Sequence, residues 1–356
     1  MSLKNFFSQN NPYQFINSNK NELFLNFINE STKLHYGNCK EYKKILDFLN
    51  YDPKIKYNIS DLPYLPVQLF KYNELLSVKK NKIVKVLHSS GTSTGVPSKI
   101  FLDKENSNNQ INALKNIFQY HFGDERLPML IIEKKSLLTN NNNFDAKKAA
   151  FYGFSIFGKN YSFALNSSGK IDYDVVNEFL NKHAKNNFII FGFTNQVFET
   201  LINKLNTKKL TQNLRNGTLI HGGGWKKMEK KKISKKEFKK KLKLKTKIHK
   251  VFNYYGLVEQ TGSIFFQCDC GYFTTSNFSD VLIRDSNFNL CKDNQKGFIQ
   301  LLSVLPTSYP GHNILTEDEG EIIIIEGKHV AVDKNNNRFN KSFDYNTPIW
   351  LVGEYA

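Results

Sequence analysis

Apolar residues along the chain first recur at helical spacing and later gather in short runs that alternate with helical segments. Residues 21–50 carry apolar side chains at intervals of three and four, which predicts helix. From residue 129 onward, the alternation of strand-sized runs with amphipathic stretches is typical of a mostly parallel sheet covered by helices. The runs predict strands at 129–132, 188–193, 218–221 and 247–254, and helices at 173–183, 196–205 and 234–244.

The flanking regions add other elements. A strand-like run at 82–87 leads into a polar, glycine-containing loop at 88–99, and a helix follows around residues 111–118. After Gly262 the chain becomes strand-rich, at 263–267, 297–305 and 321–326, which predicts a second β layer. We therefore expect an α/β fold, with a mostly parallel, helix-covered sheet and a C-terminal β-rich layer.

The charge is concentrated in one segment. The 356 residues carry a formal charge of +18, and the 14 Lys and 2 Glu between Lys226 and Lys250 account for +12 of it. Ser234 and Glu237 form an S-x-x-E capping box that predicts a short helix with its lysines in water. Two interpretations stay open, a solvated helix face and a site for an anionic surface or partner. No interleaved aromatic residues support base stacking, which disfavours nucleic acid.

Cysteine usage and hydropathy favour a cytoplasmic protein. Cys39, Cys268, Cys270 and Cys291 are too few and too scattered for a disulfide framework, and the N-terminus lacks the apolar stretch of a secretory signal. No window approaches the ~20 apolar residues that span a bilayer. Tetrahedral zinc needs four ligands, so we expect structural or incidental thiols rather than a metal site.

Three glycine-containing loops carry the candidate chemistry. Ser89-Ser-Gly-Thr-Ser-Thr-Gly95 offers hydroxyls and turn amides suited to phosphate, but it lacks the Gly-Lys-Ser/Thr of a Walker A loop. His221-Gly-Gly-Gly224 follows an apolar strand and lets a ligand approach the backbone. Tyr254 to Gly262 also follows a strand, and its Glu259 is suited to holding Mg2+ beside a phosphate. Loops at the carboxyl ends of parallel strands converge on a ligand crevice.

Two of these loops also match motifs of α/β-hydrolases. Residues 91–95 satisfy the G-x-S-x-G nucleophile elbow around Ser93, and residues 221–224 match the HGGG oxyanion motif. In hydrolases the HGGG loop precedes the nucleophile, whereas here it lies 128 residues downstream of Ser93. The segment after Gly95 also reads as extended rather than helical, so the hydrolase is kept only as a lesser alternative.

Taken together and in this order, the three loops resemble those of the adenylate-forming superfamily, which contains acyl-CoA synthetases and luciferase-like enzymes. The sequence is more closely similar to one branch, the LuxE-type acyl-protein synthetases of bacterial fatty-acid reductase systems, from about residue 10 to about residue 320. The motifs that carry the resemblance are Asn11-Pro-Tyr13, Ser89-Ser-Gly-Thr92, Pro97-Ser-Lys-Ile100, Gly223-Gly-Trp-Lys226, Tyr255-Gly-Leu-Val-Glu-Gln-Thr-Gly-Ser263, Leu305-Pro-Thr-Ser-Tyr-Pro-Gly-His312 and Leu315-Thr-Glu-Asp-Glu-Gly320.

The resemblance implies an acid–thiol ligase. Its substrate would be a carboxylic acid, expected to be a fatty acid, activated by ATP and Mg2+ as an acyl-adenylate. The acyl group would pass to a protein or carrier thiol or another acceptor, with an acyl-carrier or reductase protein as partner. The implied catalytic residues are Thr92, Lys99 and Glu259, with Glu259 also the metal ligand. The implied cofactor-binding residues are Ser89, Ser90, Gly91, Thr92, Ser93, Thr94 and Gly95 for phosphates, Gly222, Gly223, Gly224, Tyr255 and Gly256 for adenine, and Asp318 for ribose.

The chain departs from the superfamily after the last motif. The superfamily closes over the adenylate with a C-terminal domain that bears a catalytic Lys, but only 36 residues follow Gly320. We therefore expect a large domain at 1–320, helical over 1–80, and a short remnant at 321–356 with the closing domain absent or vestigial. A catalytically impaired scaffold that binds partners stays an alternative.

The LuxE branch also acylates a Cys near its C-terminus, and no Cys lies beyond Cys291. We expect either transfer in trans to a carrier thiol or another acceptor, or a chain shortened relative to its relatives. Lys328, Lys334 and Lys341 are possible substitutes for the catalytic Lys, although surface lysines are the simpler interpretation.

Overall fold

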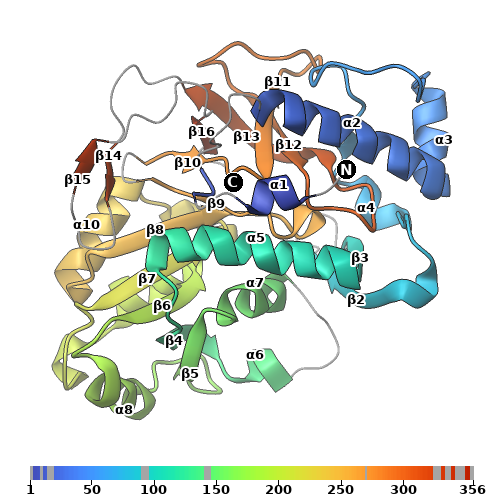
Figure 1. Cartoon of the computed structure of the whole chain (residues 1–356). Coiled ribbons are helices and arrows are strands. Elements are labelled where there is room, and N and C mark those ends of the chain that lie inside the picture. Colours follow the sequence, from blue (N-terminus) through green and yellow to red (C-terminus); the bar gives the residue numbers. More distant parts are fainter. Residues whose placement is uncertain are drawn as a thin grey trace.

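Two β-sheets with helices between and around them form the molecule (Figure 1). The structure is a computed structural model that describes residues 3–8, 11–13, 20–89, 96–139, 146–268, 271–323, 330–332, 338–340 and 349–352. The first sheet, here called the parallel sheet, has the order β5-β4-β6-β7-β8-β9, and only β9 runs antiparallel to its neighbour. Its strands are β4 (Leu127–Lys134), β5 (Gly158–Leu165), β6 (Phe188–Phe193), β7 (Gly217–Gly222), β8 (Lys250–Tyr255) and β9 (Phe265–Phe266).

The second sheet, here called the antiparallel sheet, has the order β10-β16-β13-β12-β11, and β1 adds to β13 in parallel. Its strands are β1 (Leu65–Pro66), β10 (Phe273–Thr274), β11 (Ser279–Arg284), β12 (Gly297–Ser303), β13 (Asn313–Ile323) and β16 (Ile349–Val352). Two antiparallel pairs stand apart from both sheets: β2 (Ile83–His88) with β3 (Lys99–Asp103), and β14 (Val330–Val332) with β15 (Arg338–Asn340).

Helices cover these sheets. The α-helices are α1 (Lys4–Phe7), α2 (Lys20–Asn38), α3 (Lys40–Phe48), α4 (Leu69–Tyr72), α5 (Lys104–Phe122), α6 (Ser136–Thr139), α7 (Ala146–Ser155), α8 (Tyr173–His183), α9 (Thr194–Val197) and α10 (Lys235–Thr246). Short turns of other helix types are η1 (Lys80–Lys82), η2 (Phe198–Lys204), η3 (Thr207–Lys209), η4 (Lys226–Lys231) and η5 (Val258–Gln260). Among the described residues, no helix combines the length and apolarity needed to cross a membrane.

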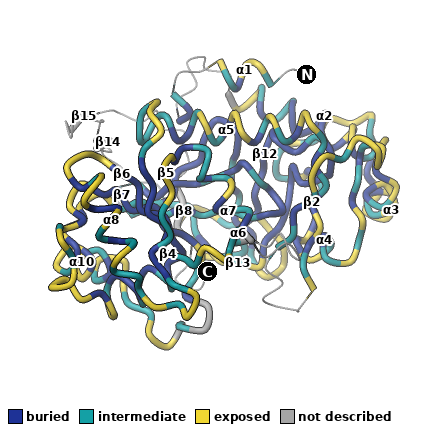
Figure 2. The backbone as a smooth tube through the Cα atoms, turned by 90° about the horizontal axis from the view of Figure 1, so that it is seen from below, coloured by how far each residue is buried: buried dark blue, intermediate teal, exposed yellow. Residues whose placement is uncertain are grey.

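The main core lies between the two sheets, where α5 and α7 pack (Figures 1 and 2). Phe118 of α5 stacks on Phe157 with ring centroids 3.7 Å apart, and Phe154 of α7 contacts Phe191 of β6. All six residues of β6 are buried, as expected of a central parallel strand covered on both faces. This core anchors the strands whose ends form the site described below.

The other face of the parallel sheet is covered by α8, η2 and α10. The N-cap of this predicted capping box is confirmed, since the Ser234 hydroxyl accepts a hydrogen bond from the Glu237 amide at the start of α10, while the Glu237 carboxylate pairs with Lys241. Phe238 and Leu242 are buried against the sheet, so the lysines of α10 face outward or along its flanks, as the spacing predicts.

Most predicted elements are confirmed, and three differ. The predicted strand at 263–267 becomes β9, which pairs with β8 at the edge of the parallel sheet instead of joining the second layer. The predicted helix at 196–205 is α9 followed by the π-helix η2. The strand predicted up to residue 326 is β13, which is described up to Ile323 and pairs with β16. The asparagine runs fall outside the described residues.

Candidate active site

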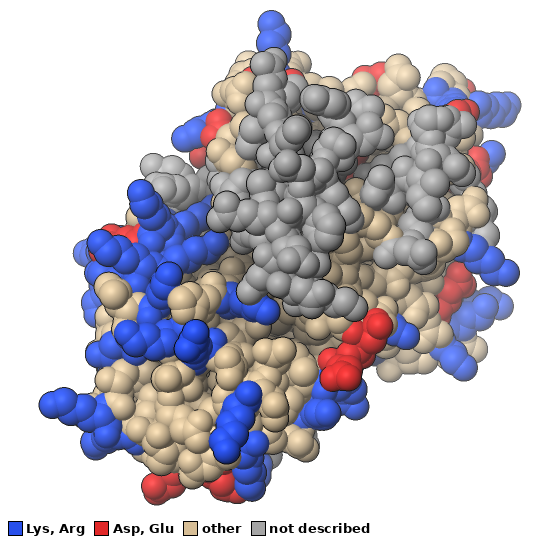
Figure 3. All heavy atoms as spheres, turned by 60° about the vertical axis from the view of Figure 1, so that its left-hand side comes forward, with Lys and Arg blue, Asp and Glu red and all other residues tan. Residues whose placement is uncertain are grey.

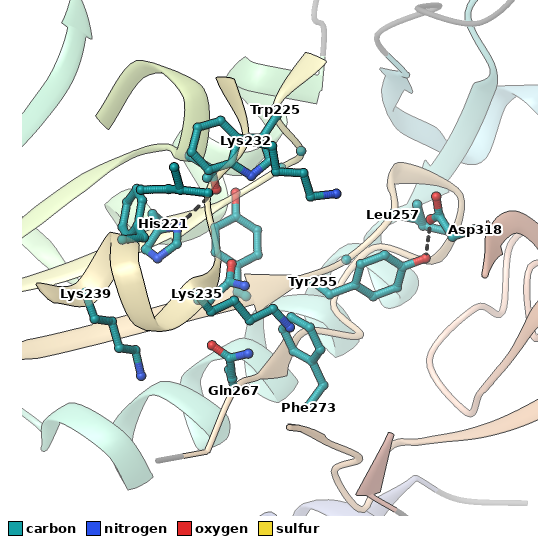
Figure 4. Close-up of a pocket in the computed structure, with 18 residues that line it drawn as sticks. His221, Trp225, Lys232, Lys235, Lys239, Tyr255, Leu257, Gln267, Phe273 and Asp318 are labelled. Carbon is teal, nitrogen blue, oxygen red and sulfur yellow. Dashed lines mark hydrogen bonds between the residues drawn. The ribbon is translucent and has the colours of Figure 1, made fainter. Parts of the chain in front are cut away.

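The carboxyl ends of β6, β7 and β8 lie at one edge of the parallel sheet because these strands run in the same direction. A pocket of about 370 Å³ opens there (Figure 4). Its wall includes Thr194 after β6, Gly223 and Gly224 after β7, and Tyr255 and Gly256 at and after β8. The second and third candidate loops therefore meet in one cavity, as the sequence predicts.

The glycine loop at the end of β7 requires glycine for steric reasons. A Cβ atom on Gly222 would lie 2.5 Å from the Tyr254 ring, and Gly223 has a φ of +71°. Thr194 hydrogen-bonds the His221 Nδ1 at 3.0 Å and donates to the Gly222 carbonyl at 3.2 Å. Burial, with Lys239 and Lys235 nearby, lowers the pKa of His221 to about 3, so this imidazole is neutral at pH 7.

Replacing Gly222 by alanine should therefore destabilise the protein by about 1–3 kcal/mol, because the buried Tyr254 ring must move out of a packed core. Thermal unfolding measures this change. The matched control is Gly37→Ala in α2, where a Cβ atom has nothing within 4 Å and alanine favours helix. A Gly222→Ala protein as stable as the Gly37→Ala protein would contradict the steric argument.

Tyr255 and Asp318 connect the two sheets across the pocket. Tyr255 ends β8 of the parallel sheet, and its hydroxyl donates a 2.6 Å hydrogen bond to Asp318 Oδ2 on β13 of the antiparallel sheet (Figure 4). Burial raises the pKa of Asp318 even though the hydrogen bond from Tyr255 opposes the shift. Residues from two motifs far apart in the sequence thus form one hydrogen-bonded pair. Asp318 lines the pocket, and its carboxylate can accept further hydrogen bonds.

Glu259 lies in η5, four residues after Tyr255, and is only 5% exposed. Burial raises the pKa of its carboxyl, while the nearby Ser98 side chain and the charge of Lys71 on α4 lower it, and Asp318 raises it again. Glu259 therefore has neighbours from three other segments of the chain. A buried carboxyl with few compensating charges is suited to receiving a cation.

The first candidate loop begins and ends beside Glu259. The amide of Ser98 donates to the Ser89 hydroxyl at 2.8 Å, and the Ser89 amide donates to the Ser98 carbonyl at 3.2 Å. These bonds close the stem of the β2–β3 hairpin, and Ser98 is fully buried against Glu259. The expected phosphate residues Ser90, Gly91, Thr92, Ser93, Thr94 and Gly95 lie outside the described residues.

Lys99 starts β3 on the exposed side of this stem and pairs in register with His88. It does not line the pocket among the described residues, so its expected phosphate contact stays a prediction. The chain that follows the G-x-S-x-G sequence enters the antiparallel strand β3 rather than a helix. In the described chain after residue 95, the helix that follows a nucleophile elbow is therefore missing, which disfavours the hydrolase alternative.

The segment 305–312 packs against the loop that contains Glu259 and holds it in place. Gln260 donates hydrogen bonds to the carbonyls of Gly311 (2.9 Å) and Leu301 (3.2 Å). A Cβ atom on Gly311 would lie 2.8 Å from the Glu259 carbonyl oxygen, so this close approach requires glycine. The motif around Tyr309, buried next to Glu259, is therefore explained by packing against the third loop.

Several lining residues were not singled out by the sequence. Thr194 follows a recognised strand but belongs to no motif, and Phe273 comes from a two-residue strand. Lys232, Lys235 and Lys239 also line the pocket, although the helical pattern indicates only that they face away from the core. The signal that the sequence offers for them is the large number of lysines in this one segment.

Among the described residues, no group of three His, Cys, Asp or Glu side chains could hold a metal by itself. Cys270 and the substitute lysines Lys328, Lys334 and Lys341 lie outside the described residues. Mg2+ is commonly held by one or two carboxylates together with substrate phosphates and water. Glu259, with Asp318 near enough to raise its pKa, fits a site of that type.

Comparison with solved structures supports the fold. The chain resembles 2-hydroxyisobutyryl-CoA ligase, solved in an open conformation with 2-HIB-AMP and CoA, with a TM-score of 0.67 and 13% identity over 86% of this chain and 66% of that one. The same ligase in the thioesterification state gives a TM-score of 0.68 and 12% identity over 90% of this chain and 66% of the other. The chain thus spans slightly less than two thirds of the ligase. The expected fold class is confirmed.

No curated protein matches the sequence. Residues 2–340 match the family described as acyl-protein synthetase, LuxE. This match covers nearly the whole chain and includes all three candidate loops, of which the second and third line the pocket. The chain therefore belongs to the LuxE acyl-protein synthetase family.

Proposed function

We propose that the protein activates a carboxylic acid with ATP as an acyl-adenylate and passes the acyl group to a thiol or another acceptor. A carboxylate oxygen attacks the α-phosphorus of ATP, the bond to the β-phosphate oxygen breaks, and pyrophosphate leaves. The observation that supports this function best is the position of the loop from Tyr254 to Gly262, which lines the pocket together with the glycine loop and also reaches the stem of the first loop. Glu259 lies beside the stem of the first loop, and Tyr255 and Asp318 line a pocket with the glycine loop.

The pocket suits the nucleoside part of ATP. Adenine would lie between Tyr255 and the backbone at Gly223 and Gly224, where the lack of side chains allows close approach, while Gly222 lies behind them against the Tyr254 ring. Asp318 would accept hydrogen bonds from the ribose hydroxyls, as an acceptor-only group does once ionised. The Tyr255 hydroxyl holds the Asp318 carboxyl in position for this contact.

The phosphate side would be formed by the first loop and Glu259. Attack of one anion on another requires neutralisation of charge, which hydroxyl and amide donors and a metal supply. When bound, Mg2+ would supply that positive charge, and Glu259 would hold it. The raised pKa of Glu259 without a cation indicates that a positive charge at this position would be stabilised.

A separate acceptor fits the two free cysteines that the structure describes, Cys39 and Cys291. Burial raises the pKa of both the Cys39 and the Cys291 thiol, so neither is activated as a nucleophile. We propose transfer in trans, to an acyl-carrier or reductase protein or to another thiol. A fatty acid is the substrate we propose on the strength of the family, and its chain length is left to experiment.

Exchange of radiolabelled pyrophosphate into ATP tests this function. The full chain is incubated with Mg2+, ATP and a panel of acids from acetate to palmitate. We expect exchange that depends on the acid and is strongest with one range of chain lengths. Absence of exchange with every acid would refute the enzymatic function and leave the partner-binding scaffold as the interpretation.

A further inference from the structure

One side of the molecule carries a set of lysines that we call the lysine face, formed by Lys230 of η4 and by Lys236, Lys240 and Lys243 of α10. All four side chains are exposed. The three on α10 follow one another at intervals of four and three residues, so they form one stripe of the helix. Figure 3 shows lysine side chains gathered over the side of the molecule where α10 lies.

The lysine face is continuous with the candidate active site. Lys232, Lys235 and Lys239 line the pocket wall, and Lys235 and Lys239 directly precede Lys236 and Lys240 of the stripe on α10 (Figure 4). Lys235 reaches over the Phe273 ring, with its Nζ 5.5 Å from the ring centroid, and thus points from α10 toward β10 of the opposite sheet. Positive charge therefore extends from the open surface to the cavity without interruption.

Acidic residues offset little of this charge. The segment 226–250 contains 14 Lys and only 2 Glu, and Glu237 is already paired with Lys241 at 2.8 Å. On η2, which packs beside α10, Glu199 is paired with Lys204 at 2.8 Å. The helix does not need these lysines for its packing, because Phe238 and Leu242 supply the buried contacts. The positive charge of the lysine face is thus available to a partner.

We propose that the lysine face docks an acidic protein that carries the acyl acceptor as a thiol and delivers it to the pocket. This inference rests on the proposed function. In the transfer, the thiol sulfur bonds to the acyl carbon, the bond between that carbon and the phosphate oxygen breaks, AMP leaves, and the thiol proton passes to solvent. Charge complementarity identifies the partner, and the pocket-lining lysines identify where its acceptor arrives.

The surface fits an acidic protein better than a membrane. Peripheral membrane helices insert a broad apolar face below their basic residues. The apolar side chains of α10 are instead buried in the protein, except for the exposed Leu244. From Lys236 to Lys243 the stripe is about 10 Å long at 1.5 Å per residue, which exceeds a single phosphate group.

The test compares wild type with a quadruple variant in which Lys230, Lys236, Lys240 and Lys243 become glutamine, which retains helix propensity. A quadruple variant with the same substitution at the exposed lysines Lys33, Lys54, Lys56 and Lys115 is the matched control. A third variant carries arginine at the four face positions and keeps the charge. The acceptor probe is holo-acyl carrier protein, an acidic thiol protein, and hydroxylamine serves as an acceptor that needs no docking.

We expect the KM for the carrier protein to rise by about 10-fold or more in the face variant and to stay near wild type in the control and arginine variants. Raising the salt concentration from 50 to 500 mM should raise the KM of the wild type for the carrier protein toward that of the face variant, because exposed charges are screened. Hydroxamate formation and pyrophosphate exchange should stay unchanged in all variants. Absence of these two activities from the wild type would refute the proposed function, independently of docking.

Direct binding of holo-acyl carrier protein, followed by fluorescence anisotropy, keeps the docking test separate from catalysis. Equal affinity of the wild type and the face variant, or no binding by the wild type at low salt, would overturn the proposal. Two further outcomes would also overturn it. In one, the face variant binds the carrier protein normally and loses only its binding to duplex DNA or to phosphatidylglycerol vesicles. In the other, its KM rises for coenzyme A but not for the carrier protein.

Discussion

Replacing Glu259 by glutamine should lower the rate of acid-dependent pyrophosphate exchange by about 10²–10³-fold, the range seen when one preorganised electrostatic contact to a transition state is removed. Glutamine has the shape of glutamate and keeps an acceptor for Ser98, but it cannot supply the negative charge that would hold Mg2+. Initial rates at saturating ATP and acid, measured over a Mg2+ titration, check this expectation.

The same variant should be at least as stable as the wild type. Burial raises the pKa of Glu259, so ionising this carboxyl in the folded protein costs more than in the unfolded chain. The wild type therefore loses stability as pH rises above the ordinary pKa of glutamate, and glutamine removes that loss. Glu125→Gln, at an exposed position, is the control and should change neither property. Full exchange activity in Glu259→Gln would contradict the metal-holding role.

The protein should lose stability steeply as pH falls from about 6.5 to about 4, the interval between the unfolded and folded pKa values of its buried histidines. His35 and His312 are fully buried, and their rings stack with centroids 5.0 Å apart. Burial lowers the pKa of His35 to about 4, and burial with the neighbouring His35 lowers the pKa of His312 well below its usual value. The hydrogen-bond partners of these rings are Ser77 and Thr32, which are neutral.

His121 and His221 behave in the same way, because burial lowers the pKa of each to about 3. Below pH 6.5 the unfolded chain binds a proton at each of these four imidazoles, whereas the folded protein does not. Each histidine then costs about 1.4 kcal/mol per pH unit, so the four together cost about 5–6 kcal/mol per unit. A typical domain has about 5–15 kcal/mol of stability, so acid unfolding is expected within this interval.

Urea unfolding at a series of pH values measures this slope, which gives the number of protons taken up on unfolding. Glu259 and Asp318 act in the opposite direction because their pKa values are raised, so the comparison between variants is more informative than the absolute slope. His35→Gln should reduce the uptake between pH 6.5 and 4 by about one proton. His249→Gln, at an exposed position, is the control for the substitution itself. Equal slopes for wild type and His35→Gln would show that His35 is not held neutral.

The parts of the site that the sequence predicts are those governed by local pattern. The buried run of β6 and the strands β7 and β8 are evident from their apolar residues, and parallel direction then brings the loops after them to one edge. The N-cap at Ser234 is also a local signal, and the structure confirms its hydrogen bond.

What the sequence could not predict depends on long-range packing. The edge strand β5 was missed because Lys159, Asn160 and Tyr161 interrupt its apolar pattern on the exposed side. The hydrogen bond between Tyr255 and Asp318 joins residues 63 positions apart on different sheets, a pairing that no local period encodes. Helical spacing likewise places Lys235 and Lys239 away from the core without showing that they reach a pocket.

The fate of the carboxylate oxygen tests the central proposal most directly. An active acid from the exchange panel, labelled with ¹⁸O in its carboxylate, is incubated with the protein, ATP, Mg2+ and hydroxylamine, and the products are analysed by mass spectrometry. Attack on the α-phosphorus predicts one ¹⁸O atom in the AMP released and none in the pyrophosphate. Label in inorganic phosphate, or AMP without label, would show that the acid is not activated as an acyl-adenylate.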